Sequence, residues 1–161
     1  MSTDELVILC LSIRDALDEW SQDGTLGSFT GLSGSEFPSG FCGIISEVMA
    51  IVLYNQTGMH PKQVTGLCEV GDTYYNKLNA NSHKWLELNG ITIDLTGDQF
   101  NSNLINVPPV LVSSTAHPLS KMMKTTKEDA YIIGVTKEAS SFDVPQLRLS
   151  SKIISFLINK I

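Results

Sequence analysis

An Asn-Gly pair at positions 89 and 90 separates two runs of alternating apolar and polar residues, Ser82–Leu88 and Ile91–Thr96. Asn-Gly in a two-residue loop is the strongest short-range signal for a tight type I′ hairpin, because both residues adopt positive φ angles readily. The turn also sets the pairing register. It places Leu88 opposite Ile91, and the residues farther from the turn then pair one by one. The sequence therefore predicts an antiparallel hairpin over residues 82–96.

This register divides the hairpin into two faces, because side chains alternate along a strand. The apolar face belongs to a core and carries Leu86, Leu88, Ile91, Ile93 and Leu95. The other face carries His83, Trp85 and Asp94. His83 and Asp94 become diagonal neighbours with Cα atoms about 7–8 Å apart or less, within reach of an imidazole–carboxylate hydrogen bond. Strands are depleted in aspartate, which makes Asp94 a candidate functional residue.

Cys42 is the candidate nucleophile for this histidine. It follows Gly40 and Phe41, precedes Gly43, and opens an apolar helical pattern. Unpaired N–H groups and the positive end of the helix dipole stabilise a thiolate at such a position. The Cys42 N–H would serve as one donor of an oxyanion hole, and the glycines leave room for a substrate carbonyl. Phe41 is expected, with Gly40 and Gly43, among the residues that contact the substrate. A carboxylate-held histidine can take a proton from the thiol.

The rest of the chain predicts one α+β domain over residues 1–161. Helical spacing of apolar residues predicts helices over 3–20, 42–56 and 145–160, with a capping box at Ser2 and Glu5. Residues 21–41 are rich in Gly and Ser and predict a long loop. Further strands are predicted over Val64–Val70, Val110–Ser113 and Ala130–Val135. Helices followed by a run of strands favour an antiparallel sheet.

Composition narrows the classes of function. A formal net charge of −6 argues against a nucleic-acid partner. The acidic start and the lack of an apolar run of about 20 residues indicate no signal peptide and no membrane span, so we expect a cytoplasmic protein, with signal-independent export left open. Three cysteines without paired spacing indicate reduced thiols, and Cys10 and Cys68 are expected in the core. No cofactor is indicated, and the oligomeric state is left open.

The segments Gly40-Phe41-Cys42-Gly43 and 82–96, in the order Cys, His, Asp, resemble the transglutaminase-like branch of the papain superfamily. The chain is also similar to small bacterial Cys-His-Asp proteins that end this segment in an Asp-Gln-Phe run, here residues 98–100. The resemblance covers roughly residues 37–100. It implies a papain-like fold, with the nucleophile helix packed on an antiparallel sheet, and a triad of Cys42, His83 and Asp94. It also points to Gln99 as a substrate contact.

The favoured hypothesis is cysteine-dependent hydrolysis of an amide in a peptide or another amide-bearing molecule, proteins included. The Cys42 thiolate would form a thioester, and His83 would protonate the leaving amine. Transglutaminase-type transfer to a second amine shares these steps. A catalytically silent papain-like binding or effector module is the alternative from another class. A metal-dependent hydrolase that uses Cys42, His83 and Asp94 as ligands lacks the usual short ligand spacing.

Other polar residues receive simpler interpretations. His60 and His117 each precede proline, which indicates loops and argues against a role in metal binding. Trp85 could cover the His–Asp pair, line the acyl site or simply pack. Asp98 and Glu47 are expected to be solvated.

Overall fold

The computed structural model describes residues 1–132 and 144–160. These residues form an α+β fold with a five-stranded, open, antiparallel sheet in the order β4-β3-β2-β1-β5. The strands are β1 (Lys62–Leu67), β2 (Ser82–Leu88), β3 (Ile91–Asp94), β4 (Leu111–Ser113) and β5 (Lys124–Asp129). The α-helices are α1 (Thr3–Gln22), α2 (Thr25–Thr30), α3 (Cys42–Thr57) and α4 (Pro145–Ile158). Short 3₁₀ helices are η1 (Gly34–Glu36), η2 (Gly97–Phe100) and η3 (Pro118–Lys121). The predicted α+β class with an antiparallel sheet is confirmed.

The Asn-Gly hairpin forms between β2 and β3 in the predicted register. Asn89 and Gly90 have φ angles of 50° and 78°, as a type I′ turn requires. Leu88 pairs with Ile91, and the pairing continues inward to Leu86 and Ile93. The first strand has the predicted bounds, whereas the second ends at Asp94 instead of Thr96.

The long helices begin and end close to the predicted positions. Ser2 caps α1: its Oγ accepts the Glu5 N–H at 3.2 Å, and Glu5 Oε2 accepts the Ser2 N–H at 2.6 Å, so the capping box is present. Gly58 ends α3 with a φ of 70°, which a residue with a side chain adopts only under strain. Within the described parts of the chain, no helix combines the length and apolar character needed to cross a bilayer.

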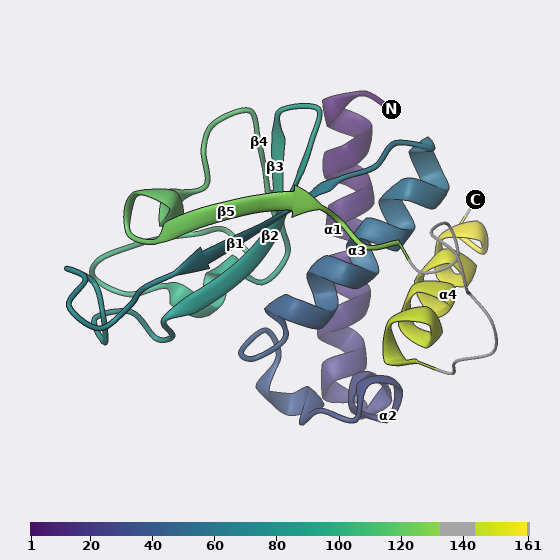
Figure 1. Ribbon diagram of the computed structural model, residues 1–161. Coiled ribbons are helices and arrows are strands. Elements are labelled where there is room, and N and C mark those ends of the chain that lie inside the picture. The colour runs from purple at the N-terminus through teal and green to yellow at the C-terminus, as the bar shows by residue number, and fades with distance from the viewer. Residues whose placement is uncertain (133–143, 161) are drawn as a thin grey trace.

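The larger core lies between the helices and the apolar face of the hairpin. Figure 1 shows the helices gathered on one side of the sheet, with α3 next to the strands and α4 farther out. Helix α3 contacts both β2 and α4, so it is buried from two directions. This explains why an unbroken run from Val48 to Leu53 is buried, although a surface helix would bury only one stripe. Cys10 also lies in this core, as predicted.

The segment predicted as a loop over residues 21–41 instead contains α2 and η1. Gly24 and Gly31 lie at the two ends of α2 with φ angles of 83° and 72°. These left-handed conformations let the chain turn sharply on both sides of a six-residue helix. The helix forms because Leu26, which is fully buried, anchors it to the core. Glycine content alone therefore overstated the length of irregular chain.

The last strand was predicted in the wrong place. Ala130–Val135 was expected as a strand, but β5 spans Lys124–Asp129, and all of its residues are exposed. Ala130 and Ile132 are buried without belonging to a strand, and residues 133–135 lie outside the described residues. The error has a physical cause: among the described strands β5 pairs with β1 alone, and it needs no apolar alternation to form. The apolar residues that follow β5 have a strand-like pattern, so the strand was predicted there instead.

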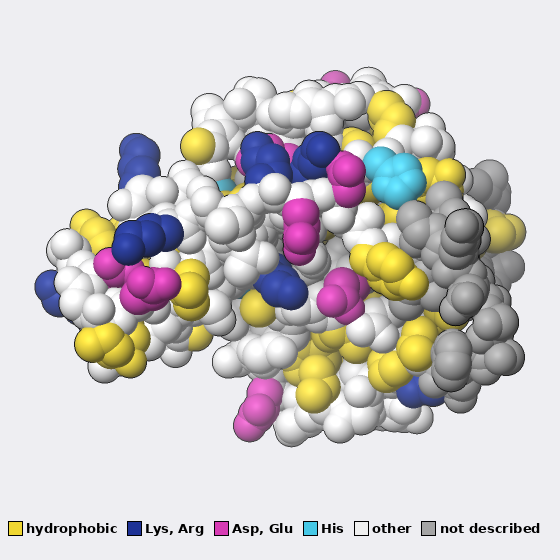
Figure 2. Space-filling view, viewed as in Figure 1, with side chains coloured by type: hydrophobic (Ala, Val, Ile, Leu, Met, Phe, Trp, Pro, Cys, Tyr) yellow, Lys and Arg dark blue, Asp and Glu magenta, His cyan; other side chains and the backbone are white. Residues whose placement is uncertain are grey.

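Charges of both signs are interspersed over the exposed surface that includes β5 (Figure 2). Lys62 pairs with Asp129 at 2.6 Å, and Lys127 pairs with Glu87. Surface pairs of this kind contribute little to stability, roughly 0–1 kcal/mol each. Charged side chains on an outer strand do, however, oppose pairing with a further strand.

Candidate active site

His83 and Asp94 meet on the face of the sheet that lies away from the helices. His83 Nε2 lies 2.7 Å from Asp94 Oδ2, and both side chains are buried. The hairpin register predicted this contact from the sequence. The face was expected to be polar, yet it is covered by a second, smaller core that contains Trp85 and Cys68. The His–Asp pair is therefore shielded from water rather than lying on an open surface.

A second histidine binds the same carboxylate oxygen. His117 Nε2 lies 2.9 Å from Asp94 Oδ2, and the Leu119 N–H donates to His117 Nδ1 at 3.0 Å. His117 was expected in a loop, with no part in metal binding, and it lies buried at the start of η3. The proline after His117 indicated the local geometry correctly. Nothing in the neighbouring sequence indicated contact with Asp94, 23 residues earlier.

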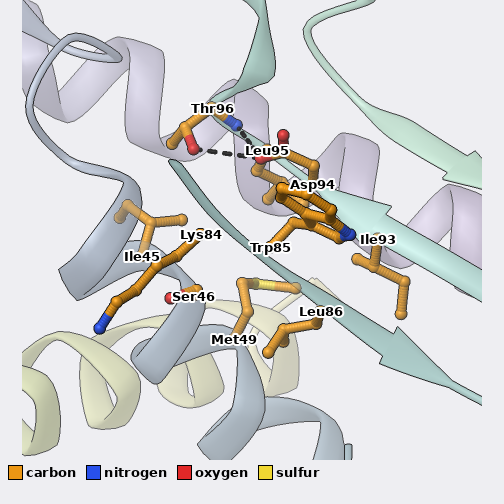
Figure 3. Close-up of a pocket in the computed structure, with 10 residues that line it drawn as sticks. All are labelled: Ile45, Ser46, Met49, Lys84, Trp85, Leu86, Ile93, Asp94, Leu95 and Thr96. Carbon is orange, nitrogen blue, oxygen red and sulfur yellow. Dashed lines mark hydrogen bonds between the residues drawn. The ribbon is translucent and has the colours of Figure 1, made fainter. Parts of the chain in front are cut away.

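The Asp94 carboxylate is fully satisfied by hydrogen bonds. Its second oxygen, Oδ1, accepts the Thr96 N–H at 2.8 Å and the Thr96 hydroxyl at 3.1 Å, as Figure 3 shows. Burial disfavours the charged carboxylate, but His83 and His117 outweigh it and hold the pKa of Asp94 well below its usual range. Asp94 is therefore an ionised group in a dry setting.

His83 has one occupied nitrogen and one unbonded nitrogen. Burial alone would lower its pKa, but Asp94 and Cys42 together raise the pKa of His83 to about 9. Nδ1 is buried and makes no hydrogen bond with any described residue. Phe100 packs edge-on against the imidazole, with ring centroids 4.8 Å apart. The ring is therefore held in place while Nδ1 stays available.

Cys42 lies at the first residue of α3 and is partly exposed. Burial opposes ionisation, but the interactions with the His83 imidazole and the Lys84 N–H outweigh it and lower the pKa of Cys42. The other cysteines behave in the opposite way, since burial raises the pKa of Cys10 to about 12 and also raises the pKa of Cys68. Of the three cysteines, Cys42 is thus the one whose pKa its surroundings lower.

Cys42 of α3 meets β2 beyond the point where β3 ends. Pairing between the two strands of the hairpin stops near Asp94, whereas β2 continues back to Ser82. His83 and Lys84 therefore extend past β3, and this is where Cys42 interacts with both residues.

A small cavity lies behind the site, between α3 and the sheet (Figure 3). Its volume is about 10 Å³, which is about the space of one water molecule. Its walls include Ile45 and Ser46 of α3, Lys84 of β2, and Asp94 and Thr96. This cavity is too small to hold a substrate.

The residues flanking Cys42 divide into open and buried positions. A Cβ atom added at Gly40 or Gly43 would meet no atom within 4 Å, so open space adjoins both glycines. Phe41, expected to contact substrate, is instead buried and packs edge-on against Phe37 with ring centroids 5.5 Å apart. It anchors the start of α3 in the core.

Gln99 connects the loop before Cys42 to the segment after β3. Its Nε2 donates to the Thr96 carbonyl at 2.9 Å, and its Oε1 accepts the Gly40 N–H at 3.4 Å. The side chain expected to bind substrate is therefore engaged within the protein. Trp85 is buried and stacks against His117, a placement that fits both covering the histidine–aspartate pair and simple packing.

Asp98 and Glu47 are also engaged, contrary to the expectation that both are solvated. Arg14 of α1 forms two hydrogen bonds with the Asp98 carboxylate, each 2.9 Å long. Arg14 is itself buried and also donates to the Leu95 carbonyl at 2.8 Å. Glu47 accepts a hydrogen bond of 2.6 Å from Gln146. Arg14 thereby ties α1 to the chain segment that leaves Asp94.

His83, Asp94 and His117 also have the residue types of a metal centre, and their potential ligand atoms lie within 4.8 Å of one another. The three residues hold one another instead through the two hydrogen bonds to Oδ2, while Thr96 occupies Oδ1. A metal ion would have to replace these hydrogen bonds.

The chain matches no family model, and it resembles no curated protein and no solved structure closely enough to count as a match.

Proposed function

We propose that this protein is a cysteine-dependent amide hydrolase with a papain-like arrangement, in which Cys42 is the nucleophile, His83 the base and Asp94 the orienting carboxylate. One observation carries the proposal. His83 is held by Asp94 through Nε2 at 2.7 Å, while its other nitrogen is buried and unbonded. The same imidazole interacts with the thiol of Cys42 and lowers its pKa.

The hydrogen bond to Asp94 assigns the tautomer of His83. An ionised carboxylate accepts a hydrogen bond, so the proton of the neutral imidazole is on Nε2 and the lone pair is on Nδ1. Nδ1 is the atom that receives the proton of the Cys42 thiol. The pKa of Cys42 is lowered while that of His83 is raised to about 9, which favours a thiolate–imidazolium pair near neutral pH.

The reaction follows from this pair. The thiolate attacks the amide carbonyl carbon, the C=O electrons move to oxygen, and the oxyanion faces the first N–H groups of α3. Phe41, the N-cap residue of α3, makes no side-chain hydrogen bond to these groups, in contrast with Ser2 at the start of α1. Collapse of the oxyanion expels the amine, which takes the proton from His83. Water, deprotonated by His83, then hydrolyses the thioester and releases Cys42.

The arrangement of elements supports the papain-like assignment. The nucleophile begins a helix that packs on an antiparallel sheet, and the histidine and aspartate come from adjacent strands of that sheet. We favour hydrolysis over acyl transfer because water needs no binding site of its own. The open space beside Gly40 and Gly43 fits a peptide or another extended amide better than a substrate that needs an enclosed pocket.

The test is selective alkylation with iodoacetamide at pH 7, with the modified cysteines mapped by mass spectrometry. We expect Cys42 to react first, while Cys10 and Cys68 serve as internal comparisons in the same chain. His83→Ala should slow the labelling of Cys42 by about tenfold or more, because each unit of thiol pKa changes the thiolate fraction tenfold. His60→Ala is the matched control, since His60 is exposed.

Equal and slow labelling of all three cysteines would exclude the proposal. A metal centre is tested separately by measuring zinc in the purified protein and repeating the labelling with a chelator. Stoichiometric zinc whose removal changes the labelling of Cys42 would favour the metal hypothesis instead.

A further inference from the structure

His83 and His117 contact the same oxygen of Asp94 but differ at their second nitrogen. The Nδ1 of His117 accepts the Leu119 N–H, so its proton is on Nε2, which donates to Asp94. Both ring nitrogens of His117 are therefore used, and this residue cannot accept a proton from the thiol. His83, by contrast, keeps Nδ1 unbonded.

His117 is held more firmly than a typical loop side chain. Trp85 of β2 stacks on its ring, with centroids 4.3 Å apart and planes 26° from parallel. The backbone of η3 fixes the ring from the other side through the Leu119 N–H. Such a ring is a rigid donor, and its Nε2–H points to a defined place in the core.

This donor constrains the Asp94 carboxylate. Thr96 fixes Oδ1, and His117 fixes Oδ2 independently of His83. With both oxygens held, the carboxylate cannot rotate about its final bond. Oδ2 then presents one remaining direction to His83, which orients the imidazole with Nδ1 toward Cys42.

We propose that His117 is a positioning residue that locks Asp94 and thereby sets the orientation of His83. This inference rests on the proposed function of Cys42, His83 and Asp94. His117 acts through Asp94 and does not touch the reacting thiol or the substrate.

The test compares His117→Gln with His117→Met. The Gln amide N–H₂ lies the same number of bonds from Cα as Nε2 and can donate to Asp94, whereas Met has similar length and no donor. The readout is the pH dependence of Cys42 alkylation by iodoacetamide. We expect His117→Met to move the midpoint upward by about one pH unit, which slows labelling at pH 7 about tenfold. His117→Gln should restore a curve close to that of the wild type.

A purely structural role for His117 predicts another outcome: both variants lose thermal stability, and neither shifts the midpoint. That result would overturn the inference while leaving the proposed function intact. Unselective labelling of the wild-type protein would instead overturn the proposed function itself. The two failures are therefore distinguishable.

A second measurement applies if His117→Met does not fold. The chain has three histidines, so ¹⁵N-histidine NMR of the wild-type protein resolves each ring, with His60→Gln used for assignment. We expect the proton of His117 on Nε2 and none on Nδ1. A proton on Nδ1 of His117 would break the bond with Leu119 and overturn the inference.

Discussion

The two faces of the sheet are built in different ways. The helix-covered face packs mainly apolar side chains, such as Leu86 and Ile93, against α3. The opposite face buries His83, Asp94 and His117 inside a smaller aromatic core. On the first face, stability comes from the apolar surface removed from water, which contributes about 25 cal/mol per Å². On the second face each polar group depends on a few specific hydrogen-bond partners, so small changes there should affect the thiol's reactivity more than folding.

Asp94→Asn should have the largest effect of any change on the polar face. The neutral side chain no longer stabilises the imidazolium of His83, and its amide can force the wrong histidine tautomer. We expect acylation of Cys42 by p-nitrophenyl acetate to slow by about 10²–10⁴-fold. The fold should remain, since the helix-covered core is untouched, and circular dichroism checks this.

Asp129→Asn is the matched control for that change, because Asp129 is exposed and forms a salt bridge with the surface residue Lys62. It should leave acylation unchanged. If Asp94→Asn acylates at the wild-type rate, the carboxylate has no part in activating Cys42.

Leu53→Ala should destabilise the helix-covered face and leave the polar face unchanged. Leu53 is fully buried in α3, so truncation removes apolar burial and leaves a cavity, at a cost of about 2–5 kcal/mol. Urea unfolding measures this loss, with Leu11→Ala as control, because Leu11 is 47% exposed and should cost about 0.5 kcal/mol or less. Cys42 should stay the most reactive thiol in the folded variant. A loss of that selectivity would mean that the two faces are coupled.

The helix-covered face could be predicted from the sequence because its signals are local. Apolar spacing and capping residues placed the long helices, and the Asn-Gly turn placed the hairpin within two residues. Strand β5 escaped prediction because an exposed edge strand carries no apolar alternation. Helix α2 was missed because its glycines mark its ends and not an extended loop.

The polar face could be predicted only in part. One turn connects His83 to Asp94, so their contact followed from register. His117 reaches Asp94 through tertiary folding, and Arg14 reaches Asp98 from a helix 84 residues away. Neither contact has a periodic or motif signature in a single sequence. Long-range partners of buried charges are set by packing, which local patterns do not encode.

Gly97→Ala tests the role of the Asp94 carboxylate, because it displaces that group without changing any polar side chain. A Cβ on Gly97 would lie 2.5 Å from Asp94 Oδ2 and 2.7 Å from Val107 Cγ1. Since Oδ2 is the atom that both histidines bind, the carboxylate must shift, and overpacking of this kind costs about 1–3 kcal/mol. We expect selective alkylation of Cys42 to weaken along with stability.

Gly66→Ala is the comparison for that variant. Its Cβ would meet the Met123 sulfur at 2.9 Å and a Trp85 carbon at 3.1 Å, on the same face but among apolar atoms. Stability should fall by a similar amount, while the alkylation of Cys42 should change less. Equal losses of reactivity in both variants would show that packing of this face, and not the carboxylate, controls the thiol.

The pH dependence of stability gives the smallest expected effect and isolates His83. Its pKa in the folded protein is raised from 6.5 to about 9, so the folded state holds the proton more tightly than the unfolded state. The resulting stabilisation is fully present below pH 6.5 and is lost as the pH rises through about 9. A Cys42→Ser background removes the titration of the thiol itself. In this background, the stability difference between the parent and His83→Gln should shrink by on the order of 1–2 kcal/mol from pH 6.5 to 9.5, measured by urea unfolding. A difference that grows with pH would mean that Asp94 does not hold a protonated His83, and the polar face would then be a neutral hydrogen-bond network.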